Sequence, residues 1–148
     1  MRPLGIAEST RIVPASAADI FDLLATPARH REIDGSGTIR GTRRGAPERL
    51  ALGARFGMRM RLWAPYQILN EVVEFEEDRR IAWRHFAGHI WRYTLEPLGP
   101  RATKVTEQFD PTHSRFPRTT RLFGWEGRNQ DAIEQTLHNL VEWASENP

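Results

Sequence analysis

Apolar and polar side chains alternate without exception from Arg55 to Leu62. The even positions hold Phe56, Met58, Met60 and Leu62, whereas the odd positions hold three arginines and a glycine. Successive side chains of a β-strand point to opposite faces of the sheet, so a period of two predicts a strand with one covered and one solvated face. A chain that contains such a strand must supply a second layer to cover the apolar face.

A long amphipathic helix near the end of the sequence can supply that layer. The spacing of apolar residues predicts this helix from about Arg128 to Ser145. Three glutamates fall outside its apolar stripe, as expected for a helix with one face on a sheet. The stripe consists of Ile133, Leu137, Leu140, Val141 and Ala144.

The other strand segments are separated by turn signals at residues 86–88 and 97–100. The segment Ile68–Glu76 has apolar residues at both odd and even positions, which indicates a bulge or a change of facing. Strands followed by one long helix indicate an α+β fold in which the helix packs on one face of the sheet. The further predicted strands are Ala7–Val13, Ile68–Glu76, Arg79–His85, His89–Leu95 and Thr103–Phe109.

Two short helices are predicted between the first strand and the rest of the sheet. Ser16 and Asp19 match a capping box, in which the serine side chain accepts a hydrogen bond from a free amide at the helix start. Apolar residues follow at helical spacing until Pro27 interrupts the helix. The residues from Ala28 to Ile33 are predicted to form the second helix.

A register can be proposed for the last three strands. A three-residue loop between His85 and His89 keeps large apolar residues on one face and arginines on the other. The facing pairs are then Trp83 with Trp91 and Ile81 with Tyr93. Across the next turn, the predicted pairs are Leu95 with Thr103, Tyr93 with Val105, Trp91 with Glu107, and His89 with Phe109.

Composition excludes several classes of protein. At 148 residues the chain fits one domain, and without cysteine it has no disulfide, thiolate nucleophile or Cys-based zinc site. The longest stretch without a charged residue, Leu62–Asn70, is far shorter than the roughly 20 apolar residues that span a membrane. The first ten residues lack the apolar core of a secretory signal. We therefore expect a cytoplasmic protein without a membrane span.

Charge is distributed unevenly along the chain. Seven arginines and one acid lie between Arg40 and Arg61, whereas five acids lie between Glu71 and Asp78. If these segments form neighbouring strands, opposite charges meet across the sheet and stabilise its outer face. The basic run also lacks interleaved aromatic residues. We therefore expect no nucleic-acid binding.

The sequence resembles the START-like superfamily, also called SRPBCC, over nearly its whole length. This superfamily includes birch-pollen-allergen-like proteins and the polyketide cyclase/dehydrase group. The resembling segments mark strand register and turns, and none of them is a catalytic signature. They are Val13–Ser16, Ile20–Leu24, Ala28–Gly37, Leu52–Phe56, Val72–Glu76, Arg79–Arg84, Trp91–Pro97 and Ala102–Glu107.

The resemblance implies a helix-grip fold, in which a curved seven-stranded antiparallel sheet wraps around the C-terminal helix and leaves a deep cavity. It also implies binding or transport of a small hydrophobic or aromatic molecule, such as a lipid or polyketide, since members bind such ligands. A minority of members are enzymes, so a polyketide cyclase- or dehydratase-like activity is the alternative. No cofactor is implied, and a monomer or homodimer is expected.

Glu107 is the best candidate for chemistry, because the predicted register places its carboxyl on the inner face of the sheet. Burial there would raise its pKa and suit it to acid–base catalysis or to donating a hydrogen bond. His85 is the second catalytic candidate, as a partner in proton transfer. With His89 it offers only two ligands, so we predict no metal site. The predicted ligand-binding residues are Phe56, Met58, Met60, Trp83, Trp91, Tyr93, Val105, Phe109, Ile133 and Leu137.

A third hypothesis is a partner-binding module with a vestigial pocket. An exposed apolar patch around Phe123 and Trp125 would favour it. Motifs for nucleotide binding or a serine nucleophile are absent from the sequence, so nucleotide-dependent chemistry is not expected.

Overall fold

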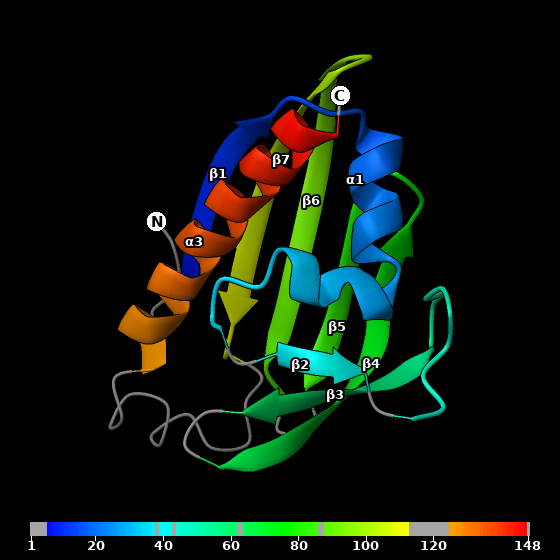
Figure 1. Ribbon diagram of the computed structural model, residues 1–148, viewed down its shortest axis with the longest axis vertical. Helices are drawn as coiled ribbons and strands as arrows, with labels where there is room; N and C mark the ends of the chain where they lie inside the picture. Colours follow the sequence, from blue (N-terminus) through cyan, green and yellow to red (C-terminus); the bar gives the residue numbers. More distant parts are fainter. Residues whose placement is uncertain are drawn as a thin grey trace.

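The computed structural model describes residues 6–37, 39–42, 44–61, 64–85, 88–112 and 125–147. Within these residues, seven strands, two α-helices and one 3-10 helix (η1) follow one another (Figure 1). In order they are β1 (Ala7–Val13), α1 (Ala17–Leu24), η1 (Pro27–Glu32), β2 (Ile39–Thr42), β3 (Arg55–Arg61), β4 (Pro65–Glu76), β5 (Arg80–His85), β6 (Ile90–Gly99), β7 (Ala102–Asp110) and α3 (Trp125–Glu146).

The seven strands form one antiparallel sheet in the order β1-β7-β6-β5-β4-β3-β2. Figure 1 shows α3, α1 and η1 on one side of this sheet, while β2 and β3 curve toward them at its far edge. The predicted α+β helix-grip fold is confirmed, including the two short helices after the first strand. The second of them is a 3-10 helix that begins at Pro27.

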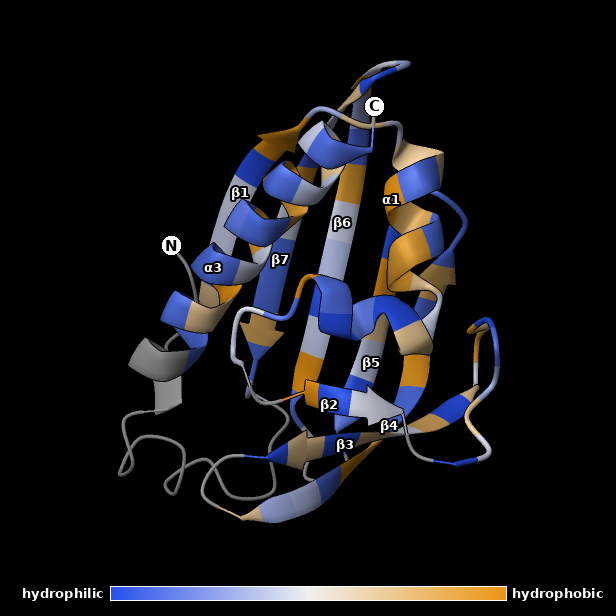
Figure 2. Cartoon of the chain, in the orientation of Figure 1, coloured by the Kyte–Doolittle hydropathy of each residue, from blue (hydrophilic) through white to orange (hydrophobic). Residues whose placement is uncertain are grey.

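Local sequence accounts for the helices. The amide of Asp19 donates to the Ser16 side chain at 3.1 Å, so the predicted cap at the start of α1 is confirmed. In Figure 2, α3 shows mostly hydrophilic residues on the side turned away from the sheet. Four residues of its predicted stripe are buried, and Val141 is half-buried. The buried ones are Ile133, Leu137, Leu140 and Ala144.

The predicted register is confirmed between β5 and β6, where Trp83 faces Trp91 and Ile81 faces Tyr93. Between β6 and β7 the prediction is wrong by two residues. β6 continues through Pro97 to Gly99, so the turn comes later than the proline-rich sequence suggested. A shift of two residues leaves every side chain on its predicted face. The observed pairs are Pro97 with Thr103, Leu95 with Val105, Tyr93 with Glu107, and Trp91 with Phe109.

The irregularity predicted in β4 is also confirmed, since the register shifts between Val72 and Glu74. The predicted meeting of charges occurs on the outer face. Glu71 of β4 accepts from Arg55 of β3 at 3.2 Å and from Arg84 of β5 at 3.1 Å. These pairs are exposed, so they contribute at most about 1 kcal/mol each.

Several predicted features lie outside the described residues. They are Leu62 of the alternating strand, the turn residues Phe86 and Ala87, and the connector with Phe123. The patch proposed around Phe123 and Trp125 therefore has no structural description. Within the described helices, none combines the length and apolar character needed to cross a membrane.

Candidate functional site

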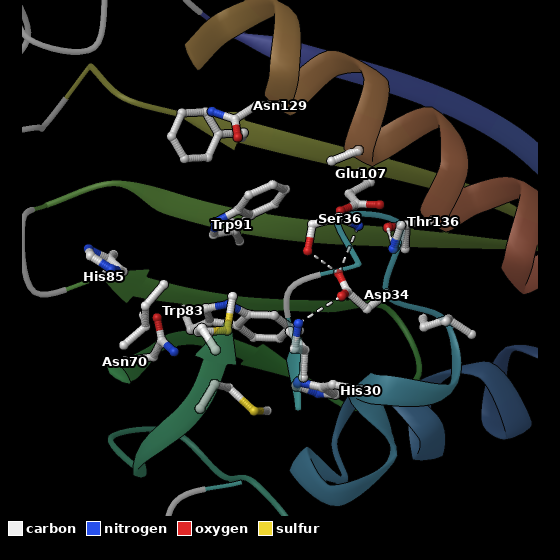
Figure 3. A pocket seen from close by; sticks show the side chains of 18 of the residues that line it. His30, Asp34, Ser36, Asn70, Trp83, His85, Trp91, Glu107, Asn129 and Thr136 are labelled. Atoms are coloured by element: carbon white, nitrogen blue, oxygen red, sulfur yellow. Dashed lines mark hydrogen bonds between the residues drawn. The ribbon is translucent and has the colours of Figure 1, made fainter. Parts of the chain in front are cut away.

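A cavity of about 940 Å³ lies between the inner face of the sheet, the segment from η1 to β2, and the first turns of α3. Figure 3 shows side chains from all three sides pointing into it. The helix α3 lies over β1 and β7, so it leaves the inner face of the other strands of the curved sheet partly uncovered (Figure 1). The size of the cavity falls in the range of pockets that hold small molecules, about 300–1,000 Å³.

Most of the predicted ligand-binding residues line this cavity. They come from β3, β5, β6 and β7, where alternate residues point inward. Their rings contact one another, with the Trp91 and Phe109 centroids 4.9 Å apart and the Trp83 and Tyr93 centroids 5.8 Å apart. The predicted residues that line the cavity are Phe56, Met58, Met60, Trp83, Trp91, Tyr93 and Phe109.

Three predicted ligand-binding residues belong to the hydrophobic core instead of the cavity lining. Val105, Ile133 and Leu137 are each 0% exposed and pack in the main apolar cluster. The apolar stripe of α3 packs against the sheet, so the helix turns a neighbouring, more polar flank toward the cavity. That flank consists of Asn129, Asp131, Ala132, Gln135 and Thr136.

Glu107 lies on the inner face of β7, and its side chain is only 2% exposed. The Tyr93 hydroxyl, directly opposite on β6, donates a hydrogen bond of 2.9 Å to Glu107 Oε2. The other oxygen, Oε1, is buried and has no hydrogen-bond partner among the described residues. Burial disfavours the charged carboxylate, so the pKa of Glu107 lies well above its usual value.

Asp34 approaches the same region from the loop between η1 and β2. Its Oδ1 accepts from the Ser36 amide at 3.0 Å and the Ser36 hydroxyl at 2.6 Å, while Oδ2 accepts from the Ile39 amide at 3.0 Å (Figure 3). These bonds fix the carboxylate in place. Its negative charge adds to the effect of burial and raises the pKa of Glu107 and of Tyr93.

The loop that carries Asp34 packs directly on α3 through Gly35. The Gly35 amide donates to Thr136 Oγ1 at 2.8 Å. A Cβ atom at this position would lie 2.4 Å from the Ala132 carbonyl oxygen and 2.4 Å from the Thr136 amide nitrogen. Glycine is therefore required by the close approach of two backbones.

Gly35→Ala is expected to lower the free energy of unfolding by about 1–3 kcal/mol, because the loop must move away from the helix. Chemical denaturation measures this change. Gly99→Ala is the matched control, since a Cβ at Gly99 meets no atom within 4 Å. A Gly35→Ala variant as stable as the Gly99→Ala variant would show that the loop does not need this contact.

His30 of η1 forms part of the cavity wall and was not predicted as a site residue. Its Nε2 lies 2.7 Å from the Leu24 carbonyl oxygen, so this nitrogen must carry the donated proton. The imidazole stacks on the Trp83 ring with centroids 5.0 Å apart. Burial lowers the pKa of His30 to about 4, which keeps the ring neutral at pH 7.

His85 and His89 stack on each other with ring centroids 5.7 Å apart, and both line the cavity. Burial, together with the charge of His89, lowers the pKa of His85 to about 4. The hydrogen-bond partner of the Glu107 carboxyl is Tyr93. Considering only the part of the chain that the structure describes, no three His, Asp or Glu side chains cluster in a way that could hold a metal ion.

Residues 6–144 match the family model described as polyketide cyclase / dehydrase and lipid transport. The chain belongs to this family. A relative in Mycobacterium tuberculosis, the uncharacterized protein Rv0088, is 43% identical over an alignment of 135 residues that covers 88% of this chain. The chain spans about 60% of the length of this relative.

Solved structures show the same fold at low sequence identity. Protein NE0264 from Nitrosomonas europaea has a TM-score of 0.74 and 13% identity, covering 99% of this chain and 98% of that one. The AHSA1-like protein from Aeromonas hydrophila has a TM-score of 0.63 and 18% identity, covering 93% of this chain and 94% of that one. At these identities the likeness concerns the fold alone.

For a member of the polyketide cyclase and lipid transport family, this cavity combines two chemical features. Its walls are aromatic and thioether side chains, which suit flat apolar molecules. Its polar groups gather at Glu107, Tyr93 and the Asp34 loop. A buried carboxylic acid can donate a hydrogen bond to a ligand or exchange a proton with it.

Proposed function

We propose that this protein binds a small hydrophobic or aromatic molecule in the cavity, as a carrier or binding protein. The observation that carries the proposal is the 940 Å³ cavity lined by seven of the predicted aromatic and methionine residues. Membership of a family described by polyketide chemistry and lipid transport supports it. The direct test is mass spectrometry of an organic extract of freshly purified protein. A stoichiometric apolar compound supports the proposal.

Met58→Trp should weaken binding of an apolar probe at least tenfold, because the indole fills space beside Phe56 and Trp83. The probe N-phenyl-1-naphthylamine reports binding by its fluorescence. Leu69→Trp is the matched control: Leu69 is exposed and lies on the neighbouring strand, with its side chain on the opposite face. Equal affinities of both variants would place the probe outside the cavity.

The alternative function is a cyclase- or dehydratase-like enzyme that uses Glu107 as an acid–base group. The buried Glu107–Tyr93 pair favours it, since burial raises the pKa of the carboxyl and suits it to deliver or accept a proton. His85 is the second candidate for proton transfer from the same cavity. Once a turnover assay exists, an unchanged rate in Glu107→Gln would reject this alternative.

We further propose that the protein is cytoplasmic, that it is a monomer or a homodimer, and that it does not bind nucleic acid. Ion pairs on the outer face support the last point, because Arg55 and Arg84 pair with Glu71, and Arg92 pairs with Glu74. Arginines that are neutralised in this way have less charge to offer to phosphates. Light scattering coupled to gel filtration tests the oligomeric state.

A further inference from the structure

The polar end of the cavity contains a buried oxygen whose hydrogen bond is missing. Glu107 Oε1 has no partner among the described residues, although the side chain is 98% buried. Leaving a buried polar atom unpaired is costly, and most such atoms in proteins have a partner. In Figure 3 the Glu107 carboxyl points into the cavity, toward the loop of Asp34 and Ser36. Glu107 is one of the residues that line the cavity, so a bound ligand lies beside its carboxyl group.

The hydrogen bond from Tyr93 determines what Oε1 can offer. Tyr93 donates its hydroxyl proton to Oε2, so Oε2 acts as an acceptor. When the carboxyl is neutral, its own proton is then best placed on Oε1. Oε1 is consequently a hydrogen-bond donor without a partner among the described residues, and an oxygen that only accepts would satisfy it. A ketone, quinone or ester carbonyl meets this requirement.

The charges around the cavity further restrict the ligand. Among the described residues that line it, Asp34, Glu107 and Asp131 bear carboxyl groups, and none is a lysine or arginine. Arg55, Arg84 and the other described arginines of the strands point to the opposite face or to solvent. Among these described lining residues, a ligand carboxylate, sulfonate or phosphate would meet the carboxylates of Asp34 and Asp131 and no cation to pair with.

The walls next to Glu107 suit a flat ring system. Trp91 and Phe109 lie 4.9 Å apart, and Phe109 also contacts His89 at 5.2 Å between ring centroids. On the other side, Trp83 is stacked on the neutral His30. Offset or edge-on contacts with such rings stabilise an aromatic ligand beyond the burial of its surface.

We infer that the ligand is an uncharged aromatic molecule whose carbonyl oxygen accepts a hydrogen bond from the Glu107 carboxyl group. This inference rests on the proposed function, because it assumes that the cavity binds a small molecule. It adds the chemical class: a neutral aryl ketone, quinone or ester is bound, and an acid of the same size is not. We therefore expect fatty acids and phosphate-bearing lipids to bind more weakly than a neutral carbonyl compound.

Three fluorescent probes of similar size test the inference. They are 6-propionyl-2-dimethylaminonaphthalene, which has a ketone; N-phenyl-1-naphthylamine, which is neutral without a carbonyl; and 8-anilinonaphthalene-1-sulfonate, which is an anion. For the unmodified protein we expect the ketone to bind about tenfold more tightly than the sulfonate, the hydrogen bond alone contributing roughly fivefold to tenfold.

Two variants isolate the hydrogen bond. Glu107→Gln keeps a donor at this position, since the amide oxygen can accept from Tyr93 while the NH₂ group faces the ligand. The double variant Tyr93→Phe/Glu107→Met removes both polar partners together, which avoids leaving one of them unpaired and protects folding. We expect Glu107→Gln to keep the affinity for the ketone within threefold. The double variant should lose fivefold to tenfold for the ketone only.

The outcomes separate this inference from the proposed function. If N-phenyl-1-naphthylamine does not bind the folded protein, the proposed function itself fails. If it binds, but the double variant keeps the full affinity for the ketone, only the carbonyl assignment is overturned. Sulfonate binding as tight as ketone binding also overturns it. A red-shifted ketone emission in the unmodified protein that is lost in the double variant confirms the hydrogen bond directly.

Discussion

Leu137→Ala is expected to lower the free energy of unfolding by about 2–5 kcal/mol and to leave ligand affinity unchanged. Leu137 is 0% exposed and belongs to the apolar cluster in which α3 packs on the sheet. It does not line the cavity. Truncation therefore creates a void in the core and removes no contact with a bound molecule. Urea denaturation gives the stability, and N-phenyl-1-naphthylamine titration gives the affinity.

Met60→Ala is the matched comparison, since Met60 is a half-buried residue that lines the cavity. We expect a smaller loss of stability, because part of its surface already faces empty space, and a weaker affinity for the probe. If Leu137→Ala weakened the probe as much as Met60→Ala does, then α3 would contact the ligand through its apolar stripe. Leu137 would then line the cavity instead of belonging only to the core.

The sequence predicts the fold well because the fold depends on periodicity. A period of two residues places Met58 and Met60 on the same face of strand β3. Helical spacing places Leu137 and Leu140 on the buried side of helix α3. The one error in register, between β6 and β7, arose because Pro97 was interpreted as the start of a turn. Proline is compatible with a strand that is irregular at that point, and the register does shift between Pro97 and Gly99.

The face of the sheet on which a side chain lies is easier to predict than its partner on the neighbouring strand. Glu107 was predicted opposite Trp91 and lies opposite Tyr93, yet it points inward in either case. That is why a sequence argument could propose a buried carboxyl without identifying its hydrogen-bond partner. A similar limitation explains why Ile133 and Leu137 were predicted to bind the ligand but pack in the core. An apolar stripe shows which side of a helix is buried. It does not show whether that side packs against other side chains or lines a cavity.

Contacts between distant segments have no local signal at all. Gly35 touches Ala132 and Thr136, about one hundred residues further along the chain. The sequence around His30 predicts only a short helix. The burial of His30 results from its packing against Trp83, which is distant in the sequence. Asp34 and Ser36 could be predicted as turn residues, but their place beside Glu107 depends on where the loop docks on α3.

We expect the free energy of unfolding to fall by about 3 kcal/mol as the pH is lowered from 6.5 to 4, because of His30. Its pKa is 6.5 in an unfolded chain and about 4 in the folded protein, where it is 7% exposed. Between these values the unfolded chain binds the proton and the folded chain does not. The stabilising contribution is therefore complete above pH 6.5 and disappears as the pH falls through this window. Urea titrations at pH 7.5 and pH 4 measure it.

His30→Gln removes this loss, because the glutamine amide can still donate to the Leu24 carbonyl but does not titrate. Glu107→Gln is the matched comparison, because Glu107 is expected to change the stability with pH in the opposite direction. The raised pKa of Glu107 stabilises the folded state below pH 4.5, and this contribution disappears as the pH rises. Glu107→Gln should thus gain stability relative to the unmodified protein toward high pH, whereas His30→Gln should gain it toward low pH. Parallel profiles for all three proteins would mean that neither group is buried in its neutral form.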